Sequence, residues 1–182
     1  MITKLRQFLF LNALRKALAA QTRKRKTFTV ETAGHIGILF DAGHDKKRRE
    51  VLEYARQLEK KGKKLKLLGF FNDKQPHEGT DFEYFTLKDL GWTGVPKGEK
   101  VSAFVREKFD LLLSFHNHEI PALEWIAAGS GAAMKIGAAT AHPNDFDVQL
   151  ETPEAKGVSY FAEQLHHYLN KIVAAHESAK TL

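Results

Sequence analysis

Short apolar runs alternate with segments of helical spacing over most of this 182-residue chain, and this alternation restricts the possible folds more than any other feature. Strands are predicted at residues 35–41, 65–71, 82–85, 109–115, 134–138 and 146–150, the last as an edge strand. Helices are predicted at 46–61, 98–108, 119–128 and 157–175, where apolar residues keep helical spacing. Because strand–helix alternation is typical of parallel sheets with helices on both faces, we expect an open three-layer Rossmann-like α/β sandwich.

The N-terminal residues do not continue this alternation. Residues 2–20 are rich in Leu and Ala and contain no Gly or Pro, which predicts a helix with apolar side chains on more than one side. A basic, polar connector follows this helix. We therefore expect a basic N-terminal helix and connector at 1–32 and a single α/β domain at 33–182.

Positive charge is concentrated at the N-terminus. Residues 1–30 contain eight Lys and Arg residues and no acid, whereas the rest of the chain holds 20 basic and 22 acidic residues. Such asymmetry favours an anionic partner, with RNA (ribosomal RNA included) first among the candidates. The predicted polyanion contacts are Arg15, Lys16, Arg23, Lys24, Arg25 and Lys26, with a second set at Lys46, Lys47, Arg48 and Arg49. For the second set, lysines that merely solubilise a helix face remain the alternative.

Other classes of protein are disfavoured or excluded. The chain has no Cys, which excludes thiol catalysis, disulfides and Cys-ligated metal centres. Arg15 and Lys16 interrupt the N-terminal apolar stretch, which disfavours a secretory signal. No stretch approaches the ~18–20 apolar residues of a membrane span. We expect a cytoplasmic protein, and attachment of the N-terminal helix to a membrane surface stays open as an alternative.

Polar residues follow several predicted strands at the edge of the sheet where ligands of open α/β folds bind. They are Asp41, Gly43, His44, Asn72, Asp73, Ser114, His116, Asn117, His118, Thr140 and His142. Asp41, His44, His116 and His118 are the candidate catalytic residues of an enzyme or of a binder of nucleotides or phosphorylated metabolites. In extended backbone His116 and His118 would point the same way, and with Asp41 or His44 they would supply three metal ligands.

The simpler interpretation is that these are ordinary polar loop residues, since the chain contains nine histidines and strand-end loops are polar in most α/β proteins. We therefore predict no metal site and no cofactor. The glycines of Gly129-Ser130-Gly131 close a helix instead of opening one, which indicates a helix C-cap and not a phosphate loop. Trp125 is predicted to lie in the core and Trp92 to plug a gap against the sheet.

Several short segments occur in a familiar order. They are GILFDA at 37–42, LGF at 68–70, FTLKDLGWTGVP at 85–96, FDLLL at 109–113, PALEWIA at 121–127, MKIG at 134–137 and LHHYL at 165–169. Together they resemble an uncharacterised family of α/β proteins of about this length from Bacteroidota. Members often carry an aspartate in the turn after the FDLL strand, where this chain has SFHNH at 114–118. The resemblance therefore implies the fold, but no activity and no family-wide histidine chemistry.

The charge pattern makes a non-catalytic RNA-binding or polyanion-binding protein the leading expectation. An enzyme or small-ligand binder that uses the strand-end crevice is the second, and a peripheral membrane protein is the third. The oligomeric state stays open.

Overall fold

A six-stranded sheet forms the centre of the computed structural model, which describes residues 2–116, 118–151, 153 and 156–180. The strands are β1 His35–Asp41, β2 Lys64–Phe71, β3 Glu83–Thr86, β4 Leu111–Phe115, β5 Met134–Ala138 and β6 Val148–Leu150. Their order is β3-β2-β1-β4-β5-β6 and every neighbouring pair is parallel. The predicted open, Rossmann-like α/β fold is confirmed. The strand order reverses between β1 and β4, which is the switch point where ligands of such folds bind.

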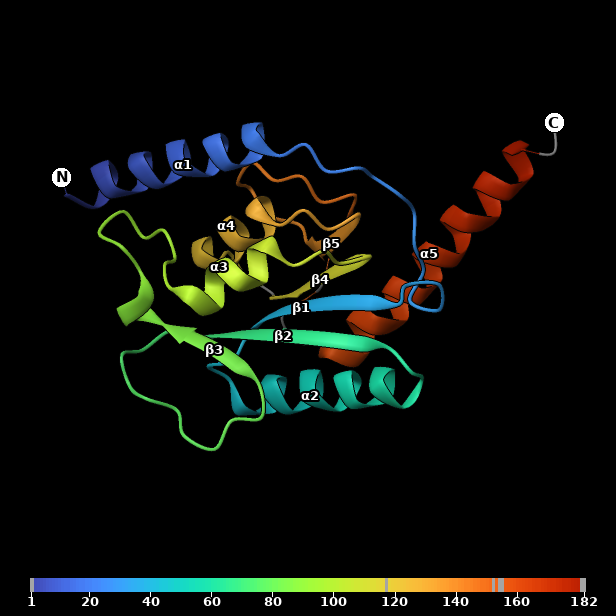
Figure 1. The fold of residues 1–182 in the computed structure, drawn as a ribbon, viewed down its shortest axis with the longest axis horizontal. Coiled ribbons are helices and arrows are strands. Elements are labelled where there is room, and N and C mark those ends of the chain that lie inside the picture. The colour runs from blue at the N-terminus through green and yellow to red at the C-terminus, as the bar shows by residue number, and fades with distance from the viewer. Residues whose placement is uncertain (1, 117, 152, 154–155, 181–182) are drawn as a thin grey trace.

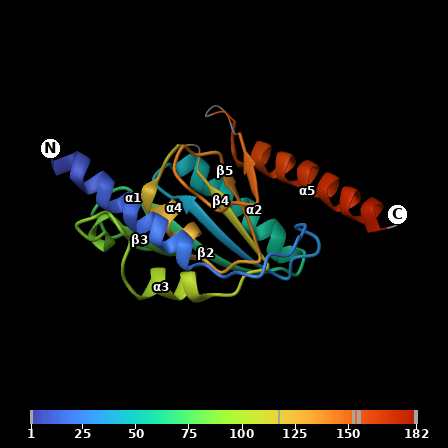
Figure 2. The same cartoon turned by 90° about the horizontal axis from the view of Figure 1, so that it is seen from above.

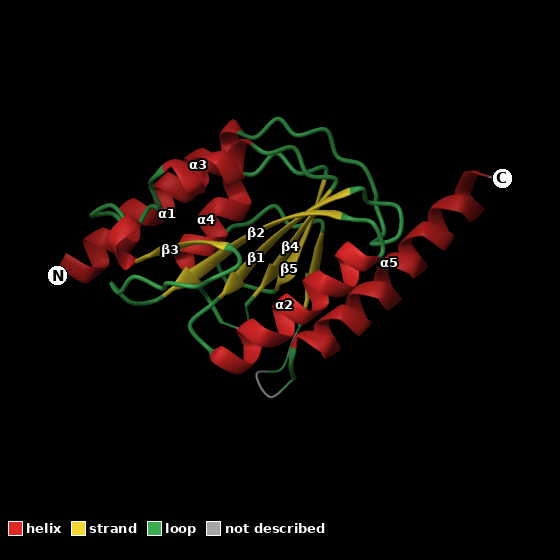
Figure 3. Ribbon diagram, turned by 60° about the horizontal axis from the view of Figure 1, so that its bottom comes forward, coloured by secondary structure: helices red, strands yellow, loops and turns green. Residues whose placement is uncertain are grey.

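Helices cover both faces of the sheet. They are α1 Ile2–Ala20, α2 Asp45–Lys60, α3 Glu99–Arg106, α4 Pro121–Gly129 and α5 Val158–Lys180, with a short 3-10 helix η1 Leu87–Asp89 after β3. Helices α2 and α5 lie on one face, and α3 and α4 lie on the other (Figure 1, Figure 3). Helix α1 packs outside α4, so that one face carries an additional layer (Figure 2).

Alternating side chains of the strands form two apolar cores. In β1, Ile36, Ile38 and Phe40 pack with residues of α2 and α5, whereas Leu39 packs with residues of α3 and α4. This is the period-two pattern of a strand that is buried on both faces. Gly137 in β5 is required for close packing, because a Cβ atom there would lie 2.5 Å from the ring of Phe146.

Glycines lie at the C-terminal ends of α2 and α4. Gly62, with a φ of 78°, follows the C-cap of α2, and α4 ends at Gly129 as the glycine pattern predicts. Residue 44, a histidine, is the N-cap of α2 and makes no side-chain capping hydrogen bond; Asp45 is the first helical residue and pairs with Arg48. The backbone N–H groups at the start of α2 therefore receive no side-chain cap.

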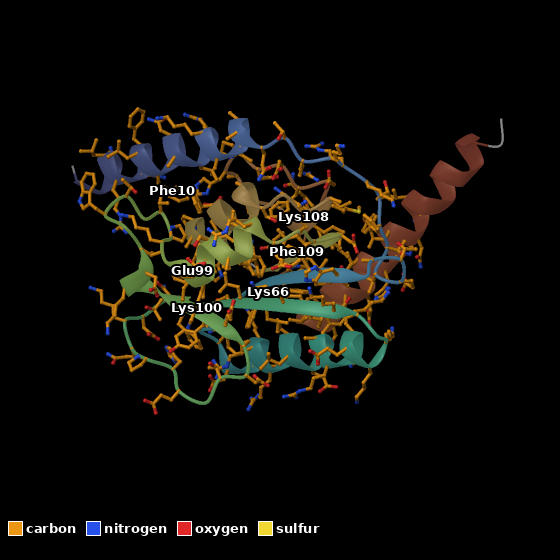
Figure 4. All side chains as sticks on the ribbon, in the orientation of Figure 1. Phe10, Lys66, Glu99, Lys100, Lys108 and Phe109 are labelled. Carbon is orange, nitrogen blue, oxygen red and sulfur yellow. The ribbon has the colours of Figure 1, made fainter. Side chains whose placement is uncertain are left out.

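Helix α1 is docked on its own chain. Phe10 and Leu14 are buried against Ala128 of α4 and the half-buried Trp125. Phe10 lies on the side of the helix that faces the body (Figure 4). On the outer side of the helix, 58% of Phe8 is exposed. The helix therefore has one buried stripe, although its apolar residues extend around it.

The connector after α1 is fixed by ion pairs. Arg23 contacts Asp145 at 3.1 Å and Asp147 at 2.9 Å, and Lys135 contacts Asp145 at 2.9 Å. We call these four residues the buried charge cluster. The side chain of Arg23 is only 3% exposed and also donates to the carbonyl oxygens of residues 132 and 133. The prediction that Arg23 contacts a polyanion is therefore wrong, because its donors are used inside the molecule.

Two further findings concern the surface. Trp92 is 63% exposed, so the prediction that it plugs a gap against the sheet is wrong. None of the helices in the described part of the chain combines the length and the hydrophobicity that a membrane crossing requires.

Candidate functional site

A groove of about 760 Å³ lies at the carboxyl ends of the strands, at the switch point of the sheet. We call it the switch-point groove. Residues of the loops after β1, β2, β4 and β5 line it, together with α1, the start of α4 and the segment 87–94. Its volume falls within the range of about 300–1,000 Å³ that is usual for small-molecule sites.

The lining of the groove combines an apolar part with a polar part. The apolar side chains are Phe10, Phe70, Leu87, Leu90 and Ile120. The polar and charged side chains are Arg6, Gln7, Asp41, His44, Asn72, Asp73, Thr93, His118, Glu119 and His142. Such a lining suits a small molecule with one apolar part and one charged or hydrogen-bonding part.

Three of the four candidate catalytic residues line this groove. Asp41 is buried at the end of β1, where its Oδ1 accepts a hydrogen bond from the N–H of Gly43 at 2.9 Å. Its Oδ2 lies 3.8 Å from Nε2 of His44. His118 is exposed at the opposite side of the switch point. Asn117 lies outside the residues that the structure describes.

His116 occupies a different place, so the prediction that it points with His118 into one site is wrong. It lines a cavity of about 20 Å³ with Asp41, Lys47 and Phe161, on the side of α2 and α5. Its Nδ1 lies 2.9 Å from the carbonyl oxygen of His118, and burial lowers its pKa. Among the described residues, no three His, Cys, Asp or Glu side chains gather closely enough to hold a metal ion.

His142 is held by a buried carboxyl group that the sequence analysis missed. Nδ1 of His142 lies 2.5 Å from Oε2 of Glu124, whose side chain is 1% exposed. On the other side of the ring, Nε2 lies 3.7 Å from Oε2 of Glu119. Burial raises the pKa of Glu124, and the hydrogen bond with His142 opposes this effect. Glu124 is the only acid in the apolar helix α4, and this signal could have identified it from the sequence.

The loop after β2 is fixed by Asp73, which accepts hydrogen bonds from the N–H of Gln75 at 2.8 Å and from Nε2 of His77 at 3.0 Å. The Gln75 hydrogen bond and then the His77 contact lower the pKa of Asp73. The ring of His77 also stacks on Phe71, with centroids 3.5 Å apart. This wall of the groove is therefore organised without a ligand.

The predicted basic residues occupy two separate surfaces. Arg15, Lys16, Lys24, Arg25 and Lys26 are exposed on α1 and the connector. Lys46, Lys47, Arg48 and Arg49 begin α2, on the opposite face of the sheet from α1 (Figure 1). The guanidinium group of Arg48 is largely used within the molecule, because it donates to the carbonyl oxygen of Ala42 at 2.6 Å and to Asp45 at 2.7 Å.

The comparisons with known proteins identify a family but no activity. No curated protein and no solved structure matches the chain. The model of a family of unknown function, DUF6913, matches residues 6–172. This range includes α1 from Arg6 onward, all six strands and the whole lining of the switch-point groove. The chain therefore belongs to the DUF6913 family.

Proposed function

We propose that the protein binds a small molecule of about nucleotide size, with a phosphate or carboxylate group, in the switch-point groove. The observation that carries this proposal is the groove itself: about 760 Å³ at the reversal of strand order, lined by apolar side chains on one part and by Arg6 and three histidines on the other. Phosphorylated metabolites and nucleotides combine the required anionic and apolar parts.

The placement of the charged groups supports an anionic ligand. Arg6 is an exposed groove residue of α1, and His118 is an exposed groove residue beyond β4. The first turn of α4 adds its positive end beside His118. Pro121 has no N–H, and the N–H groups of Leu123 and Glu124 donate to the carbonyl oxygen of Ile120, so the turn can offer an anion the N–H of Ala122. The carboxylate of Asp41 would repel a phosphate at the β1–α2 turn. We therefore expect the anionic group of the ligand to lie near the start of α4 and near Arg6.

Binding can be measured by thermal shift and calorimetry with nucleoside monophosphates, sugar phosphates and short carboxylic acids. Any of these that binds only the folded protein raises its melting temperature. Arg6→Ala and His118→Ala are each expected to weaken the binding of such an anion by about tenfold or more, because each removes a charge-assisted hydrogen bond. Lys16→Ala, an exposed residue of α1 outside the groove, is the matched control and should leave the dissociation constant unchanged. Flat melting curves throughout the panel would exclude the proposal.

A second candidate function is the binding of RNA in the cytoplasm by the exposed cations of α1 and the connector. The specific observation is that Arg23 fixes the connector to the body, so that Lys24, Arg25 and Lys26 are carried on a defined surface with Arg15 and Lys16. No acid occurs within residues 1–30, although Nε of Arg25 lies 3.6 Å from Asp147.

Fluorescence anisotropy with a single-stranded RNA tests this candidate. Affinity should fall steeply between about 50 and 200 mM salt, and the combined change of Lys24, Arg25 and Lys26 to Ala should lower the slope of log K against log salt by about two to three. The control combines Lys46→Ala with Arg49→Ala on the opposite face. Deletion of residues 1–26 is unsuitable, since it would also remove Arg23 from the buried charge cluster. An RNA-binding constant that does not change with salt would contradict this candidate function. Binding to anionic vesicles but not to RNA would indicate attachment to a membrane surface instead.

A further inference from the structure

The loop between β5 and β6 presents His142 to the switch-point groove in one fixed orientation. Nδ1 of the ring contacts Glu124 at 2.5 Å, and the side chain of Asn144 donates to the carbonyl oxygen of His142 at 3.1 Å. The ring and its backbone are therefore both held. With an ionised Glu124, the proton of the neutral imidazole lies on Nδ1, and Nε2 keeps its lone pair.

The opposite nitrogen, Nε2, lies beside a second carboxylate that also lines the groove. Glu119, whose side chain is 44% exposed, lines the groove and has its Oε2 3.7 Å from Nε2 of His142. Its Oε1 accepts a hydrogen bond from the N–H of Ala141 at 3.0 Å, which holds the carboxylate in place. A proton that arrives at Nε2 would therefore produce an imidazolium with a carboxylate on each side.

The buried carboxyl group of Glu124 is only partly paired. Its Oε1 is buried and finds no hydrogen-bond partner among the described residues, and burial raises the pKa of the carboxyl group. Leaving a buried polar atom unpaired destabilises a folded protein. Groups retained at such a cost are concentrated at functional sites.

From this arrangement we infer that the protein is an enzyme in which His142 is the acid–base catalytic residue, positioned by Glu124, for a hydrolytic reaction of the molecule bound in the switch-point groove. The inference rests on the proposed function and adds a reaction to it. Nε2 of His142 takes a proton from water. The O–H bond breaks, its electron pair stays on oxygen, and this oxygen attacks the ester carbon or phosphorus of the substrate. The ester bond breaks, and the proton on Nε2 passes to the leaving oxygen.

The hydrolysis of p-nitrophenyl acetate measures this reactivity without knowledge of the natural substrate. His142→Ala should lower the protein-dependent rate by about tenfold or more. Added imidazole should restore part of the loss, because it can enter the space that the side chain leaves. His167→Ala, an exposed residue of α5, is the matched control. A rate in His142→Ala equal to that of the unchanged protein would overturn the inference.

Two measurements separate the positioning role of Glu124 from a structural one. Nitrogen-15 NMR should show the Nδ1–H form of His142 at neutral pH; the Nε2–H form would overturn the inference, because Nε2 could then not accept a proton.

Glu124→Gln should slow ester hydrolysis while raising the free energy of unfolding at neutral pH. The pKa of Glu124 is raised on folding, so the folded state binds more protons and stability falls as the pH rises from about 4. The increase in unfolding free energy that Glu124→Gln causes should therefore become smaller as the pH falls toward about 4.

The outcomes distinguish this inference from the proposed function. Ligand binding in the thermal-shift panel, together with full ester hydrolysis by His142→Ala, leaves the binding site and removes the catalytic role. Loss of hydrolysis in His142→Ala with no binder in the panel keeps the catalytic role and overturns the assignment of an anionic ligand.

Discussion

Asp145→Asn is expected to lower the free energy of unfolding by about 3–5 kcal/mol, the cost of leaving a buried charge without its partner. Asp145 binds Lys135 at 2.9 and 3.0 Å and Arg23 at 3.1 Å. The ammonium group of Lys135 is fully buried, and its other hydrogen bond within the described part of the chain goes to the carbonyl oxygen of Ala128 at 3.4 Å. Arg23 still has Asp147 at 2.9 Å, so Lys135 bears most of the loss.

The pH dependence of this variant follows from Lys135. Burial lowers the pKa of Lys135 to about 8, against the opposing effect of Asp145, so removing Asp145 lowers this pKa further. Where the folded state has released the proton that the unfolded chain still holds, stability rises with pH. The loss of unfolding free energy that Asp145→Asn causes should therefore become smaller as the pH rises from about 7 to about 9.

Urea unfolding of a double-mutant cycle measures the pair. Lys135→Met removes the cation, which then no longer requires a partner. The free energy of unfolding of the double variant, Asp145→Asn with Lys135→Met, should therefore exceed the value expected from adding the two single effects by about 1–3 kcal/mol. If Asp145→Asn alone changed stability by less than about 0.5 kcal/mol, the cluster would not hold the connector as described.

Local patterns in the sequence predict most of the fold. The strands are runs of apolar residues bounded by polar turns, and the predicted positions of all six overlap the strands of the sheet. The edge strand is the exception in length: β6 spans only Val148–Leu150, because Asp147 belongs to the buried charge cluster and Phe146 packs over Gly137.

Long-range contacts account for the errors. Arg23 has the same local surroundings as Lys24, Arg25 and Lys26, and its partner Asp145 is 122 residues away in the sequence. His116 and His118 alternate as in a strand, but β4 ends at Phe115 and the chain then turns, so the two rings line different cavities. The spacing of apolar residues along the sequence predicts neither the ion pair between Arg23 and Asp145 nor the end of β4 at Phe115.

The position of the switch-point groove was predictable, but its composition was not. The strand ends Asp41, His44 and His118 lie where the parallel-sheet rule places them. Arg6 and Phe10 reach the groove only because α1 docks on α4, and a helix with apolar residues on several sides does not reveal which side docks. The groove is therefore built by tertiary contacts that join residues far apart in the sequence, from Arg6 to His142.

Leu14→Asp is expected to release α1 from the body and to weaken binding of the groove ligand by more than about tenfold. Leu14 is fully buried against α4. A carboxylate at this position would lose its hydration without gaining a partner, which costs more than the single apolar stripe of α1 gains by docking. Arg6, Gln7 and Phe10 would then leave the groove together.

Leu5→Asp is the matched control, since Leu5 is 51% exposed on the same helix and the same substitution there costs little. Limited trypsin digestion should cleave Leu14→Asp rapidly at Arg15 and Lys16, while Leu5→Asp resists as the unchanged protein does. The sheet should remain folded in both variants, because α1 contributes no residue to either of the two sheet cores. Undiminished ligand binding by Leu14→Asp with a cleaved α1 would mean that the groove functions without its helical wall. The anion would then be held by His118 and the start of α4 without Arg6.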